Sequence, residues 1–167
     1  MRPQQILASL SADTASDLFR YLQKEEKAAF RSCLATLAAD RKLRPVFVER
    51  KPPAERYAWM QREVARAGNE AIATNLLHIW LAGAKKSMII DFLDTVGVEH
   101  DGEGGIEQLP PEPEEEKVNA GVEKLLEQYP DEEVAAYLNA FQVMEEKGWK
   151  SLESWLEKEP RLKLGTE

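Results

Sequence analysis

The sequence lacks several features that mark whole classes of protein. It has a single cysteine, Cys33, so no disulfide can form within the chain. No apolar run approaches the roughly 18 residues that cross a bilayer. Polar residues also interrupt the apolar positions of residues 1–19 too often for a secretory signal. These absences predict a cytoplasmic protein without a membrane-spanning segment.

Signatures of catalysis are equally scarce. The chain contains no GxSxG motif, no phosphate-binding P-loop, no HExxH motif and no cluster of cysteines suited to zinc. The glycines of residues 102–105 do not stand in a strand-turn-helix pattern, so they match a dinucleotide fingerprint poorly. The sequence therefore favours a non-enzymatic protein and predicts no cofactor.

What the sequence does contain is helical periodicity. Apolar residues recur at three- and four-residue steps in residues 30–37, 72–79 and 134–141, the spacing of one face of an α-helix. Two-residue alternation is restricted to residues 45–51, which are short and have no partner strand, so we expect a short helix there. The pattern predicts an all-α protein of about seven amphipathic helices, arranged as a bundle or a short α-solenoid-like array of helix pairs.

Residues typical of helix ends divide the chain. Thr14 followed by Asp17 resembles a capping box. Pro53 suits the first turn of a helix that Gly68 can end, and Pro130 precedes three acidic residues that favour the start of another. These signals predict helices with well-defined boundaries.

Residues 97–113 differ in composition from the rest of the chain. They are rich in glycine, proline and glutamate, which is typical of a linker or a long surface loop. The glycines loosen its first part, and the prolines stiffen its second part toward polyproline II. We expect an N-terminal helical region over residues 1–96, this acidic linker, and a C-terminal helical region over residues 114–167 that packs on the first, as one domain or two.

A weak internal repeat links the two sides of this segment. Lys86-Ser87 and Lys150-Ser151 each follow an apolar helical stretch and a glycine, and each precedes a second apolar stretch. Related helix pairs of this kind stack into arrays whose concave side binds a partner. Amphipathic helices also align by chance, so both interpretations stay open.

Charge is unevenly distributed along the chain. Residues 1–96 carry 15 Lys and Arg against 11 Asp and Glu, for a net charge of +4, whereas residues 97–167 carry 7 against 19, for −12. Opposite charges of this size favour pairing within one chain or head to tail between chains. The acidic half would repel phosphate, which disfavours nucleic acid as the partner.

The basic residues 41–66 form the predicted partner-binding site. Phe47 and Tyr57 lie among its cations, a composition that suits an acidic peptide or single-stranded nucleic acid. The alternative is that the aromatic residues lie in the core and the cations form a solvated face. Outside this segment, an exposed tryptophan at the junction after Gly148 would also contribute strongly to an interface. The residues predicted to bind the partner are Arg41, Lys42, Arg44, Arg50, Lys51, Trp59, Arg62 and Trp149.

The two histidines raise the alternative of a metal centre. His100 and Asp101 form a doublet that resembles the signature of the HD phosphohydrolases, an all-helical family. The resemblance implies a metal-dependent phosphohydrolase that uses His78, His100 and Asp101, with Asp131 as a further ligand. The surroundings depart from the family's pattern, because Gly97 ends the helix before the doublet and flexible ligands hold a metal poorly. The alternative is a loop end at the doublet, with a core or interface histidine at His78.

The sequence thus predicts a cytoplasmic helical interaction or scaffold module that binds a protein partner or a second copy of itself. The first alternative is the metal-dependent phosphohydrolase. The second is nucleic-acid binding through residues 41–66. No membrane interaction is expected.

Overall fold

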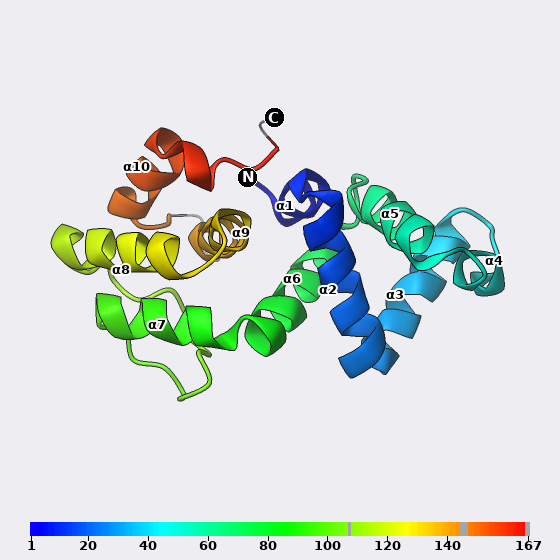
Figure 1. Ribbon diagram of the computed structural model, residues 1–167, viewed down its shortest axis with the longest axis horizontal. Coiled ribbons are helices and arrows are strands. Elements are labelled where there is room, and N and C mark those ends of the chain that lie inside the picture. The colour runs from blue at the N-terminus through cyan, green and yellow to red at the C-terminus, as the bar shows by residue number, and fades with distance from the viewer. Residues whose placement is uncertain (107, 144–146, 166–167) are drawn as a thin grey trace. The chain divides into compact units, whose positions relative to one another are not determined.

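The computed structural model describes residues 1–106, 108–143 and 147–165 of the chain. This part of the protein folds into ten α-helices and one 3-10 helix, with no strand (Figure 1). The prediction of an all-α fold is confirmed, and the expected number of about seven helices is too low. Part of the difference is α1 (Pro3–Ser9), which is too short to show a helical period, whereas the short helix α4 (Pro45–Glu49) was expected.

The chain divides into two compact units. The N-terminal unit is Pro3–Trp80, and the C-terminal unit is Leu81–Glu167 together with Met1–Arg2. The division therefore falls within α6 (Glu70–Ala84). The organisation expected from the sequence, with a linker at residues 97–113, stays a prediction; those residues lie within the C-terminal unit.

The N-terminal unit is built around α2 (Ala12–Glu25), which packs against both α3 (Lys27–Asp40) and α5 (Pro53–Val64). Helix α1 packs on α5, and α4 packs on α3. The Phe19 ring stacks on the Tyr57 ring with their centroids 6.1 Å apart, which ties α2 to α5 through apolar burial. A rigid three-helix base thus carries the short helix α4.

The helix ends agree with most of the sequence signals. Pro53 begins α5, Pro130 precedes α9 (Asp131–Gln142), and the short helix expected within residues 45–51 is confirmed as α4. The prediction of a cap at Thr14 is wrong, because α2 begins earlier. The Ser11 hydroxyl is the cap and accepts the Thr14 N–H at 3.2 Å.

The C-terminal unit contains α7 (Lys86–Val96), α8 (Glu115–Gln128), α9, α10 (Lys150–Lys158) and the 3-10 helix η1 (Pro160–Leu162). Helices α7 and α8 lie side by side (Figure 1). Gly121 permits this close packing, because a Cβ there would lie 2.8 Å from the Val96 Cγ1 atom. Four aromatic side chains fill the core next to this contact: Phe92, Tyr137, Phe141 and Trp149.

The acidic segment between α7 and α8 is attached to this unit at several points. The Leu109 side chain is buried. The Trp149 indole N–H donates to the Pro110 carbonyl at 2.9 Å. The Glu112 carboxylate accepts the Ser151 N–H and the Ser151 hydroxyl, each at 2.7 Å. These contacts hold the proline-rich part of the segment against the helices.

The repeat expected from the sequence stays a prediction. Lys86 and Lys150 each occupy the first residue of a helix, α7 and α10 respectively. The two Lys-Ser pairs therefore share a position at a helix start. This shared position is compatible both with a true repeat and with a chance alignment.

Candidate partner-binding surface

Helix α4 and the residues around it expose an unusual amount of apolar side chain. The exposed fraction is 40% for Leu43, 37% for Val46 and 56% for Phe47. In the described part of the chain, only Met1 and Val143 are comparable large apolar residues with such exposure. We define the α4 surface as Lys42, Leu43, Arg44, Val46, Phe47, Arg50 and Lys51.

The short length of α4 explains this exposure. Its five residues bury one side chain, Val48, whereas Val46 and Phe47 face solvent. Pro45 occupies the first turn, where its missing N–H costs no hydrogen bond. A helix of this length cannot bury a full apolar stripe, so its other apolar residues stay accessible.

The turn that leads into α4 has a strained backbone. Lys42 has a φ of 56°, in the left-handed region that glycine favours. Its N–H donates to the Ala39 carbonyl and the Leu43 N–H donates to the Ala38 carbonyl, both at 2.9 Å. This is the Schellman pattern that ends α3, here with lysine in the position that glycine usually occupies.

The turn is also fixed by a forked ion pair to α5. The Arg41 guanidinium donates to both carboxylate oxygens of Glu63 at 2.8 and 3.0 Å, and Arg66 donates to the same carboxylate at 3.3 Å. Hydrogen bonding from Arg41 is the largest influence, and it lowers the pKa of the buried Glu63 carboxyl. Arg41 is therefore engaged within the protein, although the sequence predicted that it binds the partner.

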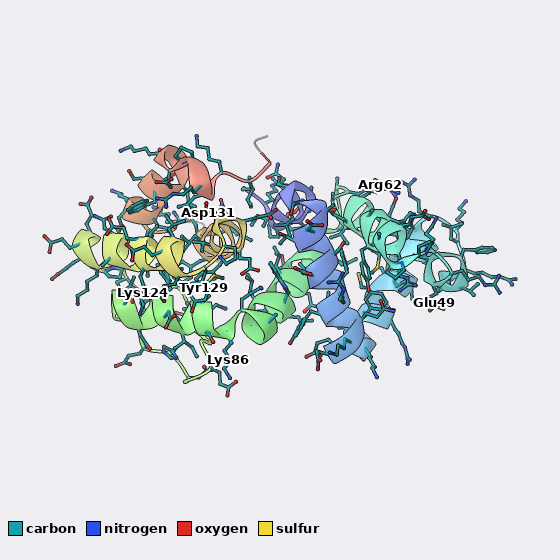
Figure 2. All side chains as sticks on the ribbon, viewed as in Figure 1. Glu49, Arg62, Lys86, Lys124, Tyr129 and Asp131 are labelled. Atoms are coloured by element: carbon teal, nitrogen blue, oxygen red, sulfur yellow. The ribbon has the colours of Figure 1, made fainter. Side chains whose placement is uncertain are left out.

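A second arginine fixes the other end of α4. The Arg56 guanidinium donates to the Glu49 carbonyl at 2.8 Å and to the Lys51 carbonyl at 3.0 Å. It also donates to the Gln23 amide oxygen at 3.0 Å. These bonds hold the C-terminal turn of α4 close to α2, so the α4 surface has a fixed support. Figure 2 marks Glu49 on this helix.

Four cations of the α4 surface have no such partners. Lys42, Arg44, Arg50 and Lys51 make no ion pair with any described residue. Lys42, Arg44 and Arg50 are exposed, and Lys51 is half-buried. All four were predicted to bind the partner, and the fold brings them together around the apolar residues.

Three other residues predicted for this role lie elsewhere. Arg62 is exposed on α5 (Figure 2). Trp59 and Trp149 are only 9% and 2% exposed, which agrees with the alternative that these rings lie in the core and not with their place among the partner-binding residues. Both are large apolar residues at core positions, and periodicity alone cannot separate a core ring from an exposed one.

Sequence reasoning also missed the apolar part of the surface. Leu43 and Val46 were not predicted to bind, and Phe47 was assigned either to the core or to the basic segment in general. A signal was present, because each of these residues stands within a few positions of a cation. What the sequence did not show is that α4 ends after five residues.

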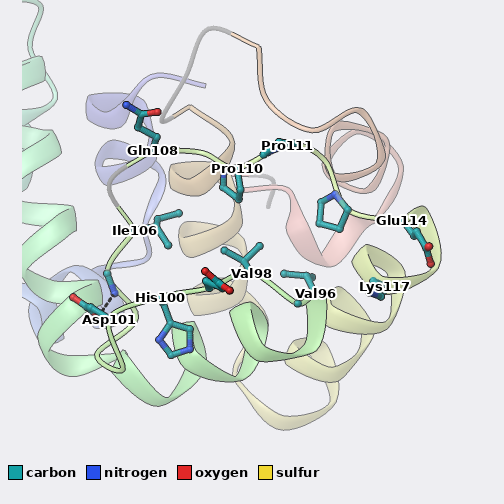
Figure 3. Close-up of a pocket in the computed structure, with 14 residues that line it drawn as sticks. Val96, Val98, His100, Asp101, Ile106, Gln108, Pro110, Pro111, Glu114 and Lys117 are labelled. Atoms are coloured by element: carbon teal, nitrogen blue, oxygen red, sulfur yellow. Dashed lines mark hydrogen bonds between the residues drawn. The ribbon is translucent and has the colours of Figure 1, made fainter.

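The histidine-aspartate doublet lies in an ordered loop of the C-terminal unit (Figure 3). His100 Nε2 is 2.8 Å from Asp94 Oδ1, and the Gly102 N–H donates to His100 Nδ1 at 3.1 Å. Nδ1 is therefore an acceptor, which places the ring proton on Nε2. Asp101 Oδ1 accepts the backbone N–H groups of Glu103 and Gly105, and these bonds lower the pKa of Asp101. The side chains of the doublet thus close a turn by accepting backbone N–H groups of the residues that follow them.

The proposed metal ligands are divided between the two units. His78 is exposed in the N-terminal unit, which excludes a core role, whereas His100, Asp101 and Asp131 belong to the C-terminal unit. Among the described residues, no three His, Cys, Asp or Glu side chains are grouped to hold a metal ion. The phosphohydrolase stays a prediction from the resemblance alone.

An open cavity of about 630 Å³ lies beside the doublet (Figure 3). Its walls combine the end of α7, the acidic segment and the start of α8. His100 and Asp101 line it, yet the hydrogen bonds above already occupy His100 Nδ1 and Asp101 Oδ1. The remaining walls include Val98, Ile106 and Lys117. The cavity therefore presents fewer polar atoms for a ligand than the list of its lining residues suggests.

The two units differ in charge. The N-terminal unit carries 12 Lys and Arg against 9 Asp and Glu, a net charge of +3, whereas the C-terminal unit carries 10 against 21, a net charge of −11.

No helix within the described residues has the length and apolar character needed to cross a membrane. Comparison with protein-family models, curated proteins and solved structures finds no match to this chain.

Proposed function

We propose that this chain is a protein-interaction module whose α4 surface binds an acidic segment of a protein partner. The observation that supports it most strongly is the combination of three exposed apolar side chains with four cations that pair with no described residue, all on and around one short, well-supported helix. Single exposed apolar residues are ordinary, whereas a group of them next to free charges is typical of an interaction site.

The two kinds of side chain serve different purposes in such an interface. Burial of Phe47 and its apolar neighbours supplies affinity, because removing about 100 Å² of apolar surface from water stabilises a complex by about 2.5 kcal/mol. The cations select acidic partners and increase the association rate. Screening over about 8 Å at physiological salt restricts this effect to nearby charges.

The charge of the chain favours protein over nucleic acid. Four free cations suit a few carboxylates, whereas a nucleic-acid site has to overcome the net charge of −8 on the whole chain. Nucleic-acid binding through residues 41–66 is therefore the weaker proposal. The cytoplasmic location expected from the sequence also stays a prediction.

The test is a selection of random linear peptides on the immobilised chain. We expect the selected peptides to be rich in Asp and Glu with at least one large apolar residue. Their binding should weaken about tenfold in Phe47→Ser and in Arg44→Glu, as expected for a central contact and a reversed charge. The matched controls are Val143→Ser and Arg31→Glu, which alter an exposed apolar residue and an exposed cation elsewhere.

Two results would contradict the proposal. One is a set of selected peptides without acidic enrichment. The other is binding that Phe47→Ser and Arg44→Glu leave unchanged. An oligothymidylate titration run in parallel would support the nucleic-acid alternative if its affinity exceeded that of the peptides and fell steeply with salt.

A further inference from the structure

We propose that the partner of the α4 surface is a second copy of this chain, which supplies the acidic residues 111–116 of its C-terminal unit. This inference rests on the proposed function of the α4 surface and identifies its ligand. The complementary groups, free cations with apolar side chains on one part and free carboxylates with prolines on the other, are both present in each chain.

Three of these acidic residues are accessible at the start of α8. Glu114, Glu115 and Glu116 are exposed and make no ion pair within the described ranges of the chain. Glu114 precedes α8, and the two others begin it. Their position at the N-terminus of α8 is compatible with the helix dipole, which favours negative charge there.

The residues before them are held in place. Glu112 is bound to Ser151, and the Pro110 carbonyl is bound to the Trp149 indole. Pro111 and Pro113 restrict the backbone between these points. A segment that is already ordered loses little conformational entropy on binding, which favours it over a flexible acidic tail.

The geometry limits how many charges take part. Successive residues of a helix are about 100° apart around its axis, so Glu115 and Glu116 point in different directions. No more than two of the three accessible acidic residues can therefore face one partner. The prolines offer apolar surface for the exposed Phe47 ring, and two carboxylates then suffice for two of the four cations.

Two copies can satisfy both sites at once. The α4 surface of the first chain binds the acidic residues of the second, and the α4 surface of the second binds those of the first, which gives a closed two-fold dimer. Each chain has a net charge of −8, which opposes association. At physiological salt, this repulsion is screened beyond about 8 Å, so the close contacts dominate.

The experiment compares the mass of the full-length chain and its variants by sedimentation equilibrium up to about 200 μM, a range that detects micromolar dissociation constants. One variant carries Arg44→Glu and Arg50→Glu, and the other carries Glu114→Lys and Glu115→Lys. We expect the unaltered chain to dimerise. Each variant alone should be monomeric because its two reversed charges repel the unaltered charges of the complementary site. An equimolar mixture should dimerise because the reversed charges of one variant then meet the reversed charges of the other.

Matched controls keep the same change of net charge at other exposed positions. They are Lys27→Glu with Arg31→Glu on α3, and Glu123→Lys with Glu127→Lys on α8. Both should dimerise like the unaltered chain. Circular dichroism of every variant confirms that the helices are intact.

Three results would overturn the inference: an unaltered chain that stays monomeric, variants that dimerise unchanged, or a mixture that stays monomeric. The peptide selection separates this failure from that of the proposed function. A monomeric chain that still selects acidic peptides through the α4 surface retains the proposed function and loses only the second copy as its ligand.

Discussion

Replacing Lys42 with glycine should stabilise the protein while weakening its interaction site. Lys42 ends α3 with a φ of 56°, a conformation that costs an L-residue roughly 1 kcal/mol and costs glycine almost nothing. Glycine also makes the unfolded chain more flexible, which offsets part of this gain. We therefore expect a net increase of about 0.5 kcal/mol in the free energy of unfolding.

Thermal unfolding followed by circular dichroism measures this change. For a chain of this size, about 0.5 kcal/mol corresponds to an increase in Tm of roughly 1–2 °C. Lys42→Ala is the matched variant, because it removes the same cation and keeps a side chain in the left-handed conformation. It should leave the Tm close to that of the unaltered chain.

A further control separates the special backbone of Lys42 from a general effect of glycine. Lys24 lies in the last turn of α2, so Lys24→Gly should lower stability by up to about 1 kcal/mol. Both Lys42 variants should bind the selected acidic peptides less tightly than the unaltered chain. If Lys42→Gly were less stable than Lys42→Ala, the strain assigned to this turn would be refuted.

Three other changes test the fold around the site. Because the folded pKa of Glu63 is lowered, its ion pair with Arg41 stabilises the protein above about pH 4.5 and is lost as the pH falls through that folded pKa. Glu63→Gln should lower stability at pH 7 by about 1 kcal/mol and remove this part of the acid dependence in urea unfolding. Gly121→Ala should destabilise the C-terminal unit by about 1 kcal/mol despite the higher helix propensity of alanine, since the new methyl group would overlap α7; an increase in Tm would disprove that close contact. The hydrogen bond from Tyr129 to Asp91 raises the pKa of Tyr129 to about 12, so an absorbance titration should show a late ionisation that Tyr129→Phe abolishes, and an unchanged curve would argue against the bond.

The fold class could be predicted because helical periodicity depends on local spacing alone. The proline signals also located real helix boundaries at Pro53 and Pro130, whereas α5 ends at Val64, before the glycine predicted to end it, Gly68. The cap at Thr14 was misplaced because Ser11, three residues earlier, is the residue whose hydroxyl caps α2. Two hydroxyl residues close together in the sequence are both suitable helix caps, so the sequence alone does not decide between them.

The site could be predicted only in part. The run of cations indicated a positively charged binding site, but it did not show that Arg41 is bound by Glu63, which lies 22 positions away. Burial likewise depends on tertiary packing. Trp149 fills the core of its unit, whereas Phe47, on a helix too short to enclose it, is exposed. The residues that best define the surface therefore had the weakest sequence signal.

The histidine-aspartate doublet illustrates the same limit. The sequence placed His100 and Asp101 next to glycines, which favoured a loose loop, and the fold gives both side chains defined hydrogen bonds. These bonds depend on Asp94 and on the turn made by the following glycines. The identities of two adjacent residues indicate neither the contact with Asp94 nor the turn.

The most direct test of the α4 surface is an amide NMR titration of the isotope-labelled chain with a selected acidic peptide. We predict that the largest chemical-shift changes fall within residues 41–51, and that they disappear in Phe47→Ser. Changes concentrated instead around the cavity beside His100, with residues 41–51 unaffected, would contradict the assignment of this surface as the binding site.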